Sequence, residues 1–179
     1  MIIFFYLKMI FVILFFSTAI HKVRYRKRHV QAIKAYEIIK EEWASLFFYI
    51  FLIFEGYISL SLILTGFTIY NTLVCLLLLS VYTIAVGINL ARGRRNLSCG
   101  CGGVLESEQL NFGIVFRNLF LMCLFLLSFF LQDLVSHPLT VDQMISIALI
   151  AGSSLLVIGI GKEIKKLKVT LGKLSQKFF

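Results

Sequence analysis

Long apolar segments alternate with short polar ones along the whole chain. Each apolar segment holds at most one charged residue and is close to the roughly 20 residues that a helix needs to cross a bilayer. The five segments are residues 2–20, 46–69, 72–91, 112–131 and 143–161. This pattern predicts an all-α, polytopic integral membrane protein with five transmembrane helices in one membrane domain, residues 1–161.

The second and third segments almost touch in the sequence, so we expect a tight hairpin near Gly66 or Asn71. Positive charge follows the first segment instead of preceding it, which is not the pattern of a cleaved signal peptide. We therefore expect the first segment to remain in the mature protein. The composition agrees with a membrane protein, because 59% of the residues are hydrophobic and 15% are charged.

Most of the 18 Lys and Arg residues lie in three polar segments, residues 21–45, 92–111 and 162–179. The alternate connections, residues 70–71 and 132–142, contain neither Lys nor Arg. Positive residues are retained on the cytoplasmic side of short loops. We therefore expect a plasma-membrane protein with its N-terminus outside, its C-terminus inside and residues 162–179 as a basic cytoplasmic tail.

The basic segment at residues 21–43 is amphipathic. Its apolar positions recur at steps of three and four, at Val30, Ile33, Tyr36, Ile39 and Trp43. We expect a helix that lies along the lipid headgroups, where its basic residues would contact anionic lipid. The chain has no aromatic-interleaved nucleic-acid-binding module, so nucleic acid is not an expected partner.

The four cysteines are of two kinds. Cys75 and Cys123 lie inside apolar segments, where a thiol behaves as a small hydrophobic group. Cys99 and Cys101 form a CGC motif in a polar loop, and a disulfide between them would close a small, strained and readily exchanged ring. Arginines at positions 92, 94 and 95 would favour the nucleophilic thiolate. The motif therefore predicts a redox pair, or alternatively two reduced cysteines in a glycine-rich turn.

No metal site is predicted. A structural zinc site needs four Cys or His ligands, and the CGC loop supplies two cysteines and no histidine. His21 and His29 are the histidines that could approach from the first basic loop. Haem attachment is not expected, because the CxxCH motif does not occur.

Two charged residues within apolar segments are candidate site residues. Glu55 lies near mid-depth of the second segment, and Arg117 is followed by Asn118 near the start of the fourth. Buried charges in a bilayer are usually paired and often functional. We expect an ion pair between Glu55 and Arg117, with Asn89 and Asn118 as hydrogen-bond partners. This cluster could simply hold the helices together, or Arg117 could hold a thiolate or the oxygen of a quinone, the one cofactor left open.

The order of these features resembles the MauE family of methylamine utilisation membrane proteins, part of the wider DoxX-like group. The stretches that carry the resemblance are FSTAIHK (16–22), AYEII (35–39), FEGYISLSLILTG (54–66), RGRRNLSCGCGG (92–103) and RNLFL (117–121). The family motif usually reads CGCFG, whereas this chain reads CGCGG, so the phenylalanine is missing. The resemblance implies a four-helix core to which the fifth segment is an addition.

The resemblance also implies a role in the maturation of an exported, disulfide-bearing protein, typified by the small subunit of methylamine dehydrogenase. A thioredoxin-like redox protein is the implied partner. Exported clients are oxidised outside the cytoplasm, whereas the charge distribution places Cys99 and Cys101 inside. Electrons could pass through the bundle, the pair could lie deep enough to be reached from outside, or the topology could be inverted.

Two other classes of function stay open. In a non-enzymatic membrane scaffold or immunity-type protein, the CGC motif would be only a structural turn and would tolerate substitution. A small-solute transporter would use Glu55, although no internal repeat or pair of broken helices is visible in the sequence.

Overall fold

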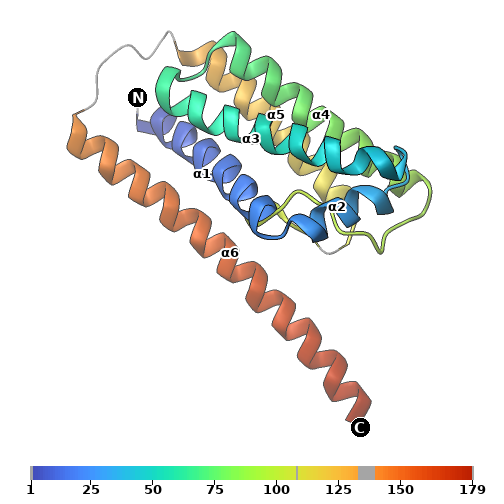
Figure 1. Cartoon of the computed structure of the whole chain (residues 1–179). Helices are drawn as coiled ribbons and strands as arrows, with labels where there is room; N and C mark the ends of the chain where they lie inside the picture. The colour runs from blue at the N-terminus through green and yellow to red at the C-terminus, as the bar shows by residue number, and fades with distance from the viewer. Residues whose placement is uncertain (1, 108, 133–139, 179) are drawn as a thin grey trace.

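The computed structural model describes residues 2–107, 109–132 and 140–178 and is helical, with no strand in those ranges. Five of its helices are long and apolar enough to cross a membrane. The elements are α1 (Ile2–Arg24), α2 (Arg26–Ala35), the short 3₁₀ helix η1 (Glu41–Trp43), α3 (Ala44–Thr65), α4 (Ile69–Ala91), the 3₁₀ helix η2 (Gly103–Leu105), α5 (Phe112–Leu131) and α6 (Val141–Phe178). The predicted class, a polytopic membrane bundle of helices, is confirmed (Figure 1).

The turn between α3 and α4 is short because polar groups close both helix ends. Gly66 ends α3 with a positive φ of 76°, and the Thr68 side chain accepts a hydrogen bond from the backbone N–H of Asn71 at the start of α4. The amide of Asn71 also donates to the Gly66 carbonyl at 2.6 Å. These bonds use backbone groups that water would otherwise have to satisfy.

The core of the bundle is aromatic. The ring of Phe125 on α5 lies 4.9 Å from the ring of Phe11 on α1 and 5.0 Å from the ring of Phe67 in the turn. All three side chains are almost fully buried. Edge-to-face packing of this kind holds α1, α5 and the hairpin together at the end of the bundle away from the CGC loop.

The basic segment at residues 21–43 is not the single helix that its periodicity predicts. Its first residues extend α1, α2 ends at Ala35, and Glu37 adopts a left-handed φ of 49°. In and just after α2 the buried positions are His29, Ala32 and Tyr36, so the face that packs on the bundle is turned by about one residue from the predicted one, and Trp43 is exposed. The physical reason is that His29 has polar partners inside, as described below.

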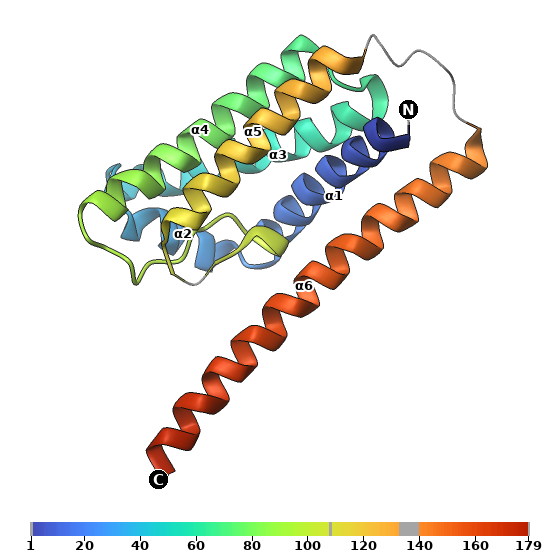
Figure 2. The ribbon, with the colours of Figure 1, turned by 180° about the vertical axis from the view of Figure 1, so that it is seen from behind.

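Helix α6 lies along α1 and continues well past the rest of the bundle (Figures 1 and 2). Its contact face repeats every four residues, at Ile147, Ala151 and Leu155, which are buried. The hydroxyl of Tyr6 on α1 donates to the hydroxyl of Ser154 at 2.9 Å. The expected fifth span and the basic tail are therefore one continuous helix.

We predict that Ala151→Leu loosens α6 from α1. Ala151 is fully buried, and added side-chain volume in a packed contact costs about 1–3 kcal/mol. Faster cleavage by protease within α6 in detergent-solubilised protein would show the loosening. Ser153→Leu, on the exposed face of the same helix, is the matched control, and equal cleavage of the two variants would contradict the packing.

Candidate functional site

Cys99 and Cys101 form a disulfide in the loop between α4 and α5. Both are buried, with exposed fractions of 7% and 4%. They belong to an apolar cluster whose other buried members are Tyr36, Val86, Leu90, Leu110 and Ile114. The disulfide is therefore sheltered between α2, α4 and the start of α5, and a partner protein would need the loop to move before it could reach either sulfur.

Hydrogen bonds from several elements hold the loop. The Cys99 backbone N–H donates to the Ser107 carbonyl at 2.9 Å. The Tyr36 hydroxyl donates to the Cys99 carbonyl at 3.0 Å, and burial raises the pKa of that hydroxyl. Arg117 on α5 donates to the Leu105 carbonyl at 2.6 Å. The loop thus has a defined conformation despite its glycines.

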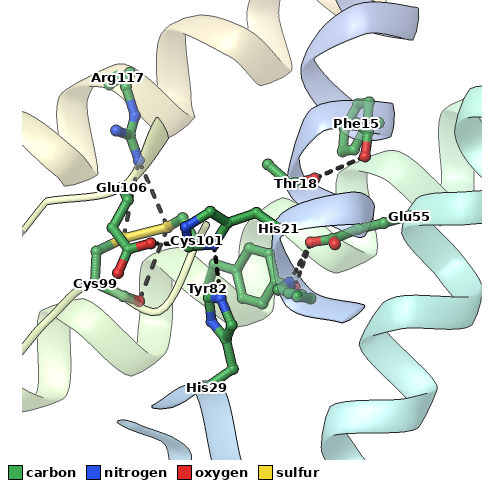
Figure 3. A network of polar contacts seen from close by, with 11 residues as sticks. Phe15, Thr18, His21, His29, Glu55, Tyr82, Cys99, Cys101, Glu106 and Arg117 are labelled. Carbon is green, nitrogen blue, oxygen red and sulfur yellow. Dashed lines mark hydrogen bonds and ion pairs between the residues drawn. A yellow bond between two sulfur atoms is a disulfide. The ribbon is translucent and has the colours of Figure 1, made fainter. Parts of the chain in front are cut away.

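Arg117 is the cation nearest the two sulfurs. Its Nη2 atom lies 3.6 Å from Sγ of Cys101 and 3.9 Å from Sγ of Cys99 (Figure 3). The same nitrogen donates to Oδ1 of Asn118 at 3.3 Å, so Asn118 helps to orient the guanidinium. Its other described contacts are neutral, which leaves a positive charge at the disulfide without a carboxylate partner among the described residues.

Two of the arginines that precede the CGC motif have other partners. Arg92 approaches the carbonyl oxygens of Tyr36 and Glu37 at 3.5 and 3.4 Å. Arg94 pairs with the Glu37 carboxylate at 2.6 Å and lowers the pKa of that group. These side chains fasten the end of α2 to the loop, so their expected role beside the sulfurs is replaced by that of Arg117.

The expected Glu55–Arg117 ion pair is wrong. Glu55 pairs with Lys22 near the end of α1, and both side chains are buried, at 1% and 3% exposed. The Tyr82 hydroxyl on α4 donates to the same carboxylate oxygen at 2.8 Å and accepts from Lys22 at 2.6 Å. The other expected partner, Asn89, donates to its own helix at the Ala85 carbonyl.

Sequence reasoning missed Lys22 and Tyr82 as site residues. Lys22 was counted with the basic loop, but α1 runs to Arg24 and places it one turn beyond Thr18 on the same buried face. A polar pair at positions i and i+4 at the end of an apolar segment is a signal that could have found it. Tyr82 is one of several hydroxyl residues in an apolar helix, and only the fold shows its partner.

A cavity of about 210 Å³ opens beside the disulfide between α2, α3 and α4. Its walls are almost entirely apolar and include Phe47, Phe51 and Ile33, while Cys99 and Gly100 lie at one side. Lys22 and Tyr82 supply its polar edge. The cavity therefore has apolar walls, hydrogen-bonding groups at its edge and a sulfur of the disulfide at one side.

The rings of His21 and His29 occupy the space beside Gly102. A Cβ atom on Gly102 would stand 3.2 Å from Cε1 of His29 and 3.3 Å from Nδ1 of His21, and its φ of 80° also favours glycine. The loop thus packs on imidazole rings at Gly102. Burial, with the nearby charge of Lys22, lowers the pKa of His29 to about 4, so its ring is neutral at pH 7.

Comparison with known proteins identifies a family that this chain matches. The family model described as methylamine utilisation protein MauE matches residues 1–131. A curated relative, methylamine utilization protein MauE of Paracoccus denitrificans, is 23% identical over 118 residues, which is 66% of this chain and 63% of the relative. No solved structure matches the chain. The family match ends with α5, so α6 lies outside it.

We predict that Glu55→Gln and Lys22→Met each destabilise the bundle by about 3–5 kcal/mol, because each leaves one buried charge without its partner. The double variant Lys22→Met with Glu55→Gln removes both charges and should recover most of the loss. The fraction of solubilised protein that stays monodisperse after heating measures the effect. A double variant less stable than both single variants would contradict the pairing.

Proposed function

Because the chain belongs to the MauE family, we propose that it supports thiol–disulfide exchange in the maturation of an exported protein. The observation that carries this proposal is the buried Cys99–Cys101 disulfide with the Arg117 guanidinium at its sulfurs. By analogy with the names of its relatives, the client would belong to methylamine utilisation, with the small subunit of methylamine dehydrogenase as the example.

The exchange is a two-electron reaction, and Arg117 favours the negative charge that forms on the departing thiolate. A thiolate of a thioredoxin-like partner attacks one sulfur of the disulfide, and the other sulfur leaves as a thiolate. The second thiol of the partner then displaces the mixed disulfide, so the partner becomes oxidised and Cys99 and Cys101 become reduced. Arg117 stabilises the departing thiolate because its positive charge lies within 4 Å of both sulfurs.

The cavity beside Cys99 supports a membrane quinone as the acceptor for the electrons. Its apolar walls suit a quinone ring, and the Lys22 ammonium lies at its edge, where its third N–H group could donate to a quinone oxygen. Two of the three ammonium N–H groups have described acceptors in Glu55 and Tyr82. Transfer of two electrons and two protons would restore the disulfide and release quinol.

The charge distribution supports an orientation with the N-terminus outside and the CGC loop at the cytoplasmic face. The loop lies at the same end of the bundle as α2, whose residues Arg26, Lys27 and Arg28 are exposed and suited to anionic lipid. In this orientation the electrons of an exported client would reach the loop through the bundle. An inverted orientation would instead place the loop directly in the exported client's compartment.

We predict that Arg117→Gln slows exchange at least about tenfold, because it removes the charge that favours the thiolate. Oxidised protein carrying Cys75→Ala and Cys123→Ser is mixed with reduced thioredoxin, and free thiols are counted by a maleimide gel shift over time. Arg92→Gln is the matched control, since that guanidinium contacts the backbone carbonyls of Tyr36 and Glu37, the two residues after α2. Equal rates in the two variants would contradict the role of Arg117.

Substitution of the cysteines separates this proposal from a scaffold or immunity-type role. Cys99→Ser and Cys101→Ser should each abolish client maturation while the protein still reaches the membrane. A scaffold in which the motif is only a turn would tolerate both changes and would instead fail when Lys22 or Glu55 is replaced.

We also predict that a short-chain quinone reoxidises the reduced cysteine pair without oxygen, with one quinol formed for each disulfide. Ala85→Trp should block this step, because Ala85 lines the cavity and a large ring there would fill it. Anaerobic thiol counting together with quinol absorbance measures the reaction. Unchanged reoxidation in Ala85→Trp would place the acceptor outside the cavity.

A further inference from the structure

Three side chains beside the disulfide have no part in the proposed exchange. His21 lies in the last turn of α1, His29 lies on α2 and Glu106 follows η2. Nδ1 of His21 is 2.9 Å from Nε2 of His29 and 3.4 Å from Oε2 of Glu106 (Figure 3). One potential ligand atom from each residue lies within 4.8 Å of the other two.

A hydrogen bond alone does not account for this arrangement. Nδ1 of His21 carries at most one hydrogen, so it can donate to His29 or to Glu106 but not fully to both. Oε2 of Glu106 is buried and accepts no hydrogen bond from any described residue. A buried acceptor without a donor is costly, which points to a cation as its missing partner.

We propose that His21, His29 and Glu106 bind a divalent transition metal ion, with Zn²⁺ as the ion that best suits these ligands. Two imidazoles and one carboxylate form a known three-ligand zinc set, with the fourth position left to water. Ligand atoms at about 2.0–2.1 Å from one tetrahedral ion stand roughly 3.3 Å from each other. The observed separations of 2.9 and 3.4 Å are close to that spacing.

Nearby positive groups leave room for the ion. Arg28 pairs with the other oxygen of Glu106, Oε1, at 3.2 Å, and its side chain is half exposed. Lys22 is buried near His29, but its charge is matched by Glu55. Neither cation therefore takes the carboxylate oxygen that faces His21, and Arg28 fixes the carboxylate in place.

The site would tie the redox loop to α1 and α2. Gly102 follows Cys101 directly and packs against both imidazole rings. A bound ion would fix the positions of both rings. It would thereby restrict movement of the loop that contains the disulfide. Metal binding is a separate property from thiol exchange, because neither sulfur is a ligand.

The test is zinc binding by the full-length protein, purified in detergent through a tag without histidines. The disulfide is kept oxidised and Cys123 is replaced by Ser, so that exposed thiols do not contribute. After dialysis against buffers of graded free Zn²⁺, elemental analysis should find one tightly held ion per chain. His29→Gln and Glu106→Gln should each weaken binding at least about 100-fold, more than the usual effect of losing an outer partner.

Glu41→Gln is the matched control, because this carboxylate is exposed and pairs with Lys34, and it should bind Zn²⁺ as the parent does. Co²⁺ substitution gives a second readout, since a four-coordinate site of nitrogen and oxygen ligands has visible absorption bands that His21→Gln should abolish. Failure of the parent protein to retain Zn²⁺, or equal affinity in His29→Gln, Glu106→Gln and Glu41→Gln, would overturn the proposal.

Discussion

The rest of the structure depends on the buried pair of Lys22 and Glu55. Two opposite charges within an apolar bundle must contact one another, because neither can be solvated there. Their contact, with Tyr82 hydrogen-bonded to both, joins α1, α3 and α4 at one depth. It also fixes the rotation of α1, so that Ser17 and His21 face the CGC loop.

The conformation of the loop follows from that rotation. Gly103 lies so close to α1 that a Cβ atom there would be 2.6 Å from the Ser17 hydroxyl, and Gly102 lies against the rings of His21 and His29. With Lys22 held by Glu55, Arg117 is left for the disulfide. The bundle therefore separates Lys22, which is neutralised by a carboxylate, from the partly buried Arg117, which is available to a thiolate.

The fold was predictable because bilayer thickness and apolar segment length are tied by simple geometry. The CGC pair and Arg117 could also be found, since cysteines beside glycines and a charge in an apolar helix are unusual in sequence. Which cation pairs with Glu55 could not be predicted from the sequence. The sequence indicated Arg117 as the partner of Glu55, and only packing shows that α1 continues far enough to present Lys22. For the same reason, the approach of His21, His29 and Glu106 depends on three separate elements and has no local signal.

The face of α2 that packs on the bundle also has a structural account. The rings of His21 and His29 lie beside Gly102, the residue after Cys101. This packing turns α2 by about one residue from the face that its apolar periodicity predicts. A polar residue with buried partners can therefore outweigh a weak amphipathic pattern in a short helix.

The proposed function requires Cys99 and Cys101 to change redox state as the protein works. The most direct measurement is the redox state of this pair in native membranes, captured by acid quenching of cells and maleimide gel shift. We predict that both the oxidised and the reduced pair are present in aerobic cells and that the reduced form rises when the quinone pool is reduced. A pair that stays fully oxidised or fully reduced under both conditions would contradict it.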